Sequence, residues 1–264
     1  MFHSRKFFYI LFVVGALYAL LVQQFFKNEA RFIIQSKSYP ANVSYSFSQE
    51  FQELNLPINE TLNLHGLWFK KADSASVVLF FPDQETDLRK IKIEKNNYYE
   101  SGFGIVIAAY RGSAKSTEKA TDEADLYSDA QHWYNFVRSQ YSENKIIVVG
   151  EGFGASIAAY IAGENNPKAL ILETPAFSYS DYLAKSRFWW IPFNTFTSFH
   201  LNTWENIRKA SCEIVLIIDT KKSKNALELG RYLKPTDLLF ELSPSNEWSS
   251  ATKQKFEIYL NSIH

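Results

Sequence analysis

The fold of this chain is decided by residues 145–175, which read KIIVVGEGFGASIAAYIAGENNPKALILETP. Four apolar residues lead into three glycines at alternate positions, Gly150, Gly152 and Gly154, and a long run of small and apolar residues follows. A second short apolar run, ALILE, begins at Ala169. Short β-branched runs are typical of buried strands, whereas longer alanine-rich runs favour helices. The stretch therefore predicts a strand, a sharp glycine turn, a helix and a second strand.

The same alternation extends in both directions along the chain. Short apolar runs begin at residues 77, 104, 146, 169, 214 and 238. Helical patterns lie between them, the clearest with apolar residues at Leu126, Ala130, Trp133, Val137 and Tyr141. Strands that alternate with helices predict an α/β fold, with a doubly wound, mostly parallel sheet and helices on both faces. Two earlier segments, FQELNLPI at residue 51 and LNLHGLWFK at residue 62, alternate apolar and polar residues and predict an antiparallel pair.

Composition excludes several classes of function. Lysine plus arginine equals aspartate plus glutamate at 28 each, so no net charge attracts nucleic acid. The single cysteine, Cys212, excludes an intrachain disulfide and a cysteine-ligated metal cluster. No histidine–carboxylate spacing suggests zinc, and we expect no metal and no cofactor. A dinucleotide fingerprint would need a third glycine where Ala155 stands, although Glu173 could supply its acidic residue.

The N-terminus predicts a membrane anchor in residues 1–27. Residues 7–26, FFYILFVVGALYALLVQQFF, carry no charge, and a helix of this length spans about 30 Å, the thickness of the hydrocarbon core. A cleaved signal peptide is the competing interpretation, but VQQFFKNEA offers no convincing small-x-small cleavage site. A buried helix of a soluble protein is a third interpretation, but the segment is apolar on every face, as a membrane span is.

Orientation depends on a near tie between the flanking charges. Arg5 and Lys6 precede the span, whereas Lys27 and Arg31 follow it with Glu29 between them. We expect a single-pass protein with a cytoplasmic N-terminus and its domain on the opposite side. Residues 28–48 are polar and predict a tether to a domain that occupies residues 49–264.

One segment interrupts the alternation of strands and helices. Residues 177–209 lie between two core strands and are rich in aromatic residues, so we interpret them as a cap over the strand ends. Within the cap, RFWWIPF at residues 187–193 contains Trp189, Trp190 and Phe193. These aromatics either cover the top of the sheet as a lid or bind a lipid, a peptide or the membrane interface.

Several motifs together carry a family resemblance that covers nearly the whole chain after residue 47. They are GIVIAAYRGSAKST at residue 104, DLYSDAQHWYNFV at residue 125 and VVGEGFGASIAAYIA at residue 148. In this order they resemble the α/β-hydrolases, and more narrowly a membrane-anchored bacterial branch related to serine aminopeptidase-like and Bem46-like proteins. The resemblance implies the α/β-hydrolase fold and a serine nucleophile at the centre of a Gly-x-Ser-x-Gly turn.

The resemblance also identifies the positions where hydrolytic chemistry is missing. The nucleophile position falls on Gly152, which has no side chain. The loop that supplies oxyanion donors becomes Pro82-Asp83, where proline removes a donor and a carboxylate repels an oxyanion. The acid position falls on Lys222 and the base position on Ser245 or Asn246.

Other side chains offer weaker substitutes. Asp219 could replace the acid, but it stands where the family has glycine. Glu151 and Asp83 could form a paired-carboxylate site above the sheet, although they are better explained as solvated loop charges. Ser156 is expected to pack in the helix, Ser113 and Ser116 to be solvated, and His65 and His132 to lie at the surface or half buried, while His200 could overhang the pocket.

These observations favour a membrane-anchored pseudoenzyme, which lacks nucleophile, acid, base and oxyanion loop and acts by binding a lipid, a peptide or a protein. Its pocket would be lined by the elbow, residues Gly150, Glu151, Gly152, Phe153 and Gly154, together with Pro82 and Asp83. Two alternatives remain open: an active serine-type hydrolase of esters or amides with an unorthodox site, and a purely structural or interaction protein.

Overall fold

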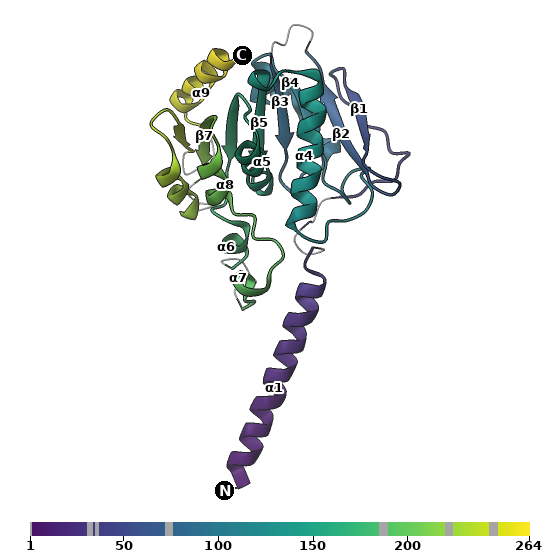
Figure 1. The fold of residues 1–264 in the computed structure, drawn as a ribbon, viewed down its shortest axis with the longest axis vertical. Coiled ribbons are helices and arrows are strands. Elements are labelled where there is room, and N and C mark those ends of the chain that lie inside the picture. Colours follow the sequence, from purple (N-terminus) through teal and green to yellow (C-terminus); the bar gives the residue numbers. More distant parts are fainter. Residues whose placement is uncertain are drawn as a thin grey trace.

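The computed structural model describes residues 2–30, 34, 37–71, 76–184, 190–219, 224–242 and 248–264. Within these residues one eight-stranded sheet forms the centre of a rounded domain, and one long helix projects from it (Figure 1). The strands are β1 (Gln52–Pro57), β2 (Asn63–Phe69), β3 (Val77–Phe81), β4 (Gly104–Ala108), β5 (Ile146–Glu151), β6 (Ala169–Glu173), β7 (Glu213–Ile218) and β8 (Leu238–Glu241).

Helices fill most of the connections. The α-helices are α1 (Phe2–Lys27), α3 (Asn97–Glu100), α4 (Glu123–Gln140), α5 (Phe153–Glu164), α6 (Tyr179–Ala184), α7 (Phe193–Phe196), α8 (Thr203–Lys209) and α9 (Ser250–Ile263). The 3-10 helices are η1 (Leu88–Lys90), η2 (Ile93–Lys95), η3 (Glu143–Lys145) and η4 (Lys224–Tyr232).

The sheet has the strand order β1-β2-β4-β3-β5-β6-β7-β8. β2 runs antiparallel to both β1 and β4, and every pairing from β4 to β8 is parallel. The predicted doubly wound, mostly parallel sheet with an antiparallel pair at its start is therefore confirmed. Phe81 at the end of β3 pairs with Gly150 near the end of β5. The loop that follows β3 therefore starts beside the glycine turn that follows β5.

Alternate residues of the strands pack into two cores, one on each face of the sheet. On one face Val148 lies in a cluster with residues of α4 and α5, including Trp133 and Ile157. On the other face Val149 lies in a cluster with residues of α9, including Phe256. Burying a side chain of this size stabilises the fold by about 1.5–3 kcal/mol, so the strands are held from both sides.

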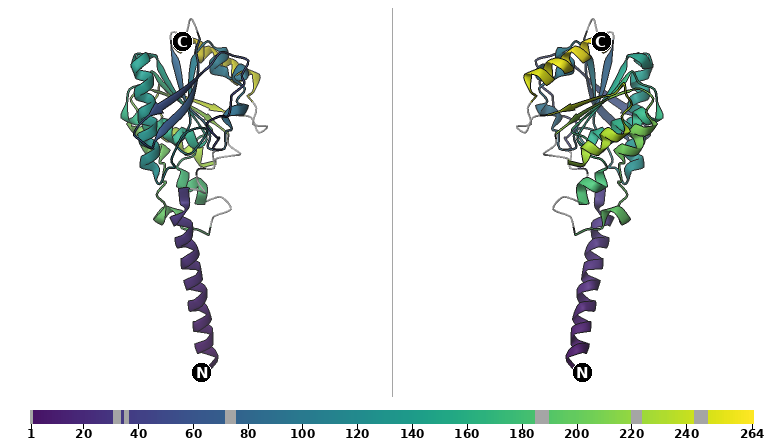
Figure 2. Two further views of the ribbon diagram at one scale, coloured as in Figure 1. Left: turned by 90° about the vertical axis from the view of Figure 1, so that its right-hand side faces the viewer. Right: turned by 90° about the vertical axis from the view of Figure 1, so that its left-hand side faces the viewer.

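Helix α1 projects from the domain as a single exposed rod (Figures 1 and 2). Its apolar span, Arg5–Lys27, has 23 residues and a mean hydropathy of 1.9. By length and composition it can cross a membrane, as a signal anchor or a signal peptide would.

Residues 37–48, in the segment predicted as a tether, pack on the domain. Ser38 forms a β-bridge with Ala114, and Tyr39 donates its hydroxyl hydrogen bond to Asp87. The ring of Tyr45 stacks on His65 with 5.4 Å between centroids. The domain end of this segment is thus anchored to the sheet.

The carboxyl ends of the parallel strands face α1. The cap, residues 177–209, follows the end of β6, and its helices α6 and α7 lie beside the upper end of α1, on the side of the sheet from which α1 projects (Figures 1 and 2). Any site at this edge of the sheet therefore lies on the side of the domain from which the apolar helix projects.

Candidate functional site

The turn between β5 and α5 has the sharp geometry that the sequence predicts. Gly152 lies between the last residue of β5 and the first of α5, with φ +54° and ψ −113°. Its N–H donates to the backbone oxygen of Glu173 at 2.9 Å, which ties the turn to the end of β6. A residue other than glycine is strained in this conformation, by about 1–3 kcal/mol.

The flanking glycines let α5 lie against the sheet. A Cβ atom on Gly154 would stand 2.1 Å from the backbone oxygen of Phe81, and one on Gly150 would stand 2.4 Å from the backbone oxygen of Gly154. Both distances are far below van der Waals contact. Both glycines are therefore required by packing, independently of any chemistry at the turn.

The Asp83 side chain occupies the position where a residue-152 side chain would begin. A Cβ atom built on Gly152 would stand 2.0 Å from Asp83 Oδ2. The same Oδ2 accepts a hydrogen bond from the backbone N–H of Phe153 at 3.0 Å, and Oδ1 accepts one from the N–H of Glu85 at 3.0 Å. A carboxylate is stabilised there because the first N–H groups of a helix lack partners one turn earlier in the helix and carry partial positive charge.

Aromatic side chains close the space beside this carboxylate. The ring of Phe153 meets Tyr110 edge-on at 5.5 Å and Tyr179 at 5.0 Å between centroids. The Tyr110 hydroxyl donates to the backbone oxygen of Pro82 at 2.6 Å, and its pKa is raised well above the usual value because the group is buried, with the charge of Asp83 adding to the shift. Gln84 and Tyr179 also share hydrogen bonds, of 2.8 and 3.1 Å.

Two cavities lie near this part of the sheet edge. The one lined by Asp83 and Tyr110 has a volume of about 10 Å³, enough for one water molecule at most. A larger cavity of about 140 Å³ lies between Ile34 and Arg111. Neither cavity has Gly152 in its lining, and the Asp83 carboxylate is the group that lies next to Gly152.

Two further acidic residues lie side by side at the same edge of the sheet. Glu151 and Glu173 are register neighbours at the ends of β5 and β6. Tyr98 donates its hydroxyl hydrogen bond to Glu173 at 2.5 Å. Burial raises the pKa of Glu173 to about 7 against the opposing effect of the Tyr98 hydrogen bond, and the negative charge of Glu151 raises it further. The structure thus puts Glu151 beside Glu173, and Asp83 at the N-terminus of α5.

This carboxyl predicts an unusual pH dependence of stability. Because folding raises the pKa of Glu173 from 4.5 to about 7, the folded chain binds the proton more tightly than the unfolded chain. The resulting stability is fully present below pH 4.5 and is lost as the pH rises through 7. We expect the free energy of unfolding of the wild type, relative to that of Glu173→Gln, to fall by on the order of 2 kcal/mol as the pH rises from 4.5 to above 7. The conversion uses about 1.4 kcal/mol per pKa unit, with a reduction because the Glu173 side chain is partly exposed to solvent. Urea unfolding at several pH values measures it, and a constant difference would contradict it.

Several predicted positions lie outside the described residues, so their geometry stays a prediction. They are the acid position Lys222, the base position Ser245 with its neighbour Asn246, and the cap residue Trp189. Asp219, the substitute acid, is described and is buried just after β7. Phe193 begins α7.

Three of the weaker candidates differ from expectation. Ser113 and Ser116 are buried rather than solvated, because the Ser113 hydroxyl donates to the Tyr110 backbone oxygen at 2.6 Å and the Ser116 hydroxyl accepts from the His65 N–H at 2.9 Å. His65 is fully buried and lies 3.3 Å from Glu53. These short hydrogen bonds depend on how strands and loops meet, which the local pattern does not reveal. Ser156 packs inside α5 and shares a 2.7 Å hydrogen bond with Thr203.

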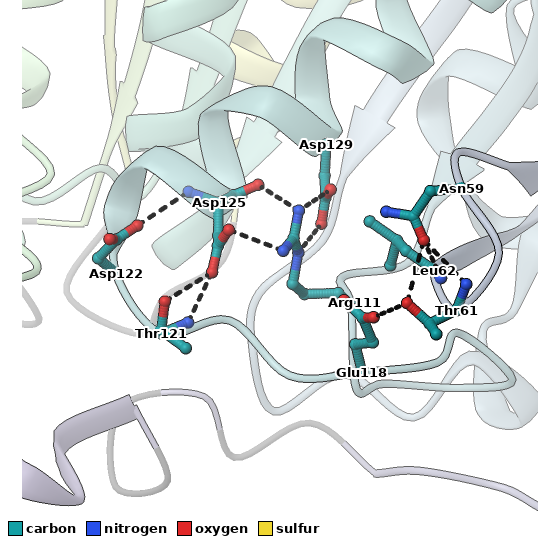
Figure 3. A network of polar contacts seen from close by, with 9 residues as sticks. All are labelled: Asn59, Thr61, Leu62, Arg111, Glu118, Thr121, Asp122, Asp125 and Asp129. Atoms are coloured by element: carbon teal, nitrogen blue, oxygen red, sulfur yellow. Dashed lines mark hydrogen bonds and ion pairs between the residues drawn. The ribbon is translucent and has the colours of Figure 1, made fainter.

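A buried arginine network between the loop after β4 and α4 was not predicted from the sequence (Figure 3). The guanidinium of Arg111 contacts Asp129 through Nε at 2.7 Å and Nη2 at 2.5 Å, and Asp125 through Nη1 at 2.7 Å. Asp125 in turn accepts hydrogen bonds from the backbone N–H and hydroxyl of Thr121. The network joins the loop after β4 to α4. Arg111 lies in the motif GIVIAAYRGSAKST, and Asp125 and Asp129 lie in the motif DLYSDAQHWYNFV. The presence of both motifs was the signal from which the network could have been predicted.

Comparison with known proteins agrees with this geometry. A family model described as serine aminopeptidase, S33, matches residues 96–216, which include the turn at Gly152. The matched segment spans somewhat less than half of the chain, and over that segment the chain is similar to this family. No curated protein sequence is similar enough to match it.

Solved structures share the fold at low sequence identity. An esterase from Pyrococcus furiosus is 16% identical with a TM-score of 0.61, over 86% of this chain and 97% of that chain. An α/β hydrolase from Vibrio vulnificus is 19% identical with a TM-score of 0.62, over 81% and 80%. An acylaminoacyl peptidase from Pyrococcus horikoshii is 15% identical with a TM-score of 0.59, over 81% of this chain and 41% of that chain. The expected α/β-hydrolase fold is thus confirmed.

Proposed function

We propose that this chain is a membrane-anchored pseudoenzyme of the α/β-hydrolase fold, which uses its scaffold to bind a lipid, peptide or protein and does not cleave it. We also propose that the chain belongs to the membrane-anchored, serine aminopeptidase-like branch that its motifs resemble. The observation that carries it is the position of Asp83. Its carboxylate accepts the hydrogen bond of the Phe153 N–H and leaves no room for a side chain on residue 152.

This arrangement opposes acyl transfer in two independent ways. Attack needs a hydroxyl at the turn, and Gly152 has none. Stabilising a tetrahedral intermediate needs free N–H donors, and the Phe153 N–H is already bonded to an anion. A carboxylate at that donor repels a developing oxyanion, so the turn offers neither a nucleophile nor a free Phe153 donor.

The anchor in this proposal is α1. Its apolar span is exposed and is long enough for a bilayer. We propose that it is retained as a signal anchor, with its N-terminus in the cytoplasm and the domain on the opposite side.

A reactive-serine assay tests the function directly. We expect the purified full chain to show no labelling by a fluorophosphonate probe and no turnover of short-chain esters above a heat-inactivated sample. The esterase from Pyrococcus furiosus, handled identically, serves as the positive control. Labelling and turnover that both disappear when one serine is replaced by alanine would overturn the proposal and support an active hydrolase instead.

A further inference from the structure

The cap lies directly against α1, the apolar helix. The Tyr18 hydroxyl donates to the backbone oxygen of Trp190 at 2.8 Å, and the two rings lie 6.4 Å apart between centroids. Nearer the domain, the rings of Phe26 and Phe196 lie 5.8 Å apart. The two contacts are eight residues apart on α1, so the cap follows the domain end of α1 for about two turns (Figure 2).

A buried carboxylate fixes the cap at this height. Glu29, just beyond α1, is only 3% exposed. It accepts hydrogen bonds from the backbone N–H of Ser198 at 2.9 Å and from the Thr197 hydroxyl. Burial raises the pKa of Glu29, and these hydrogen bonds oppose that shift. The end of the anchor and the end of α7 are thus connected through polar groups that are shielded from water.

The position of Tyr18 sets the depth of the cap relative to the anchor. Tyr18 precedes Lys27, the last residue of the apolar span, by nine residues. At 1.5 Å per residue, the Tyr18–Trp190 contact lies about 13 Å along the helix from that polar end. A hydrocarbon core about 30 Å thick that encloses the span Arg5–Lys27 therefore reaches the level of Trp190.

The cap residues at this level are apolar and exposed. Trp190 is 41% exposed and Phe196 is 60% exposed. Phe196 lies beside Phe26 at the polar end of the span, near the boundary between acyl chains and headgroups where aromatic residues are favoured, whereas Trp190 lies deeper among the acyl chains. In water the two side chains form an unfavourable apolar surface next to an equally exposed apolar helix.

We propose that the cap segment 190–196 inserts into the lipid bilayer around α1, so that the carboxyl edge of the sheet faces the membrane surface. The partner of this surface is the bilayer itself. The inference rests on the proposed anchoring by α1, but it does not depend on whether the domain is catalytically silent. Insertion of the cap also fixes the distance of the domain from the bilayer and its orientation, because the domain is then attached at two points, the cap and α1.

The depth of the cap can be measured in the full chain reconstituted into phosphatidylcholine vesicles. Phe196→Cys and Ile258→Cys are labelled with an environment-sensitive fluorophore in a Cys212→Ser background. Ile258 is the matched control, because it is 62% exposed and lies on α9, at the far end of the domain. We expect lipids with a nitroxide near the headgroup end of the acyl chain to quench the label at position 196 about threefold more strongly than the label at position 258.

A second measurement avoids changing the buried cysteine. Brominated lipids should quench the native tryptophan fluorescence, and Trp190→Phe should remove part of the quenched signal, whereas Trp248→Phe, which alters a ring packed on α9, should not.

Three outcomes would contradict the inference, and they are distinguishable. Equal quenching at positions 196 and 258 in chains that resist alkaline carbonate extraction would overturn this inference alone. Release of the chain by carbonate would overturn the anchor and this inference together. Cross-linking of two copies of the Phe196→Cys variant through the introduced thiol, without lipid quenching, would mean that protein covers the surface, which also overturns it.

Discussion

Replacing Gly152 by serine is expected to lower the free energy of unfolding by about 3 kcal/mol. One part is backbone strain, about 1–3 kcal/mol, because φ is +54° at this residue. The other part arises because the new Cβ would stand 2.0 Å from Asp83 Oδ2, so the carboxylate must leave the Phe153 N–H. A hydrogen bond to a charged group contributes about 1.5–3 kcal/mol, which makes its loss measurable.

A double-mutant cycle separates the two parts. In an Asp83→Ala background the carboxylate is already absent, so Gly152→Ser should cost about 1–2 kcal/mol less than in the wild type. Urea unfolding of the detergent-solubilised full chain, followed by tryptophan fluorescence, provides the free energies. Gly230→Ser is the matched control, because the nearest atom to a Cβ there is 4.0 Å away. An equal cost of Gly152→Ser in both backgrounds would show that Asp83 does not occupy the site in solution.

The second large effect is expected at the arginine network. Asp129→Asn should lower the free energy of unfolding by about 3–4 kcal/mol, since it leaves a guanidinium that is only 9% exposed without its two-point carboxylate partner. Asp125 is 28% exposed, and its side chain contacts a single nitrogen of the guanidinium, so it compensates in part. The same urea unfolding experiment measures the loss.

The expected loss depends on the burial of the ion pair as well as on its charge, and an exposed ion pair serves as the comparison. Glu205→Gln removes an ion pair with Lys209 in which both side chains are about half exposed, at 49% and 48%. Exposed pairs contribute less than about 1 kcal/mol. A similarly small loss for Asp129→Asn would mean that the buried network is not required for stability.

The fold could be predicted from local patterns because each strand and helix is marked by its own residues. Apolar runs locate the parallel strands, and the glycine turn predicts where α5 begins, at Phe153. The absence of a nucleophile at Gly152 follows from the sequence once the motif is aligned. The seating of Asp83 does not, because it depends on the loop after β3 meeting α5, 70 residues later in the chain.

Contacts with the largest sequence separation were the least predictable. Tyr18 and Trp190 are 172 residues apart, and nothing near either residue indicates that they meet. The burial of Glu29 could not be predicted either, because in the sequence Glu29 is simply one of several charged residues that flank the apolar span. Its place in the structure is set by the cap, whose path over the sheet edge has no periodicity that a pattern could detect.

A match to the glycine motif of the turn gives more information about how α5 packs on the sheet than about chemistry at Gly152. Gly150 and Gly154 are needed wherever a helix lies this close to two strands, so a chain keeps them whether or not it breaks bonds. The central residue of the five is the one that bears the nucleophile in the Gly-x-Ser-x-Gly motif. A pattern search that scores the outer glycines therefore measures the packing of a helix on a sheet and carries no information about that nucleophile.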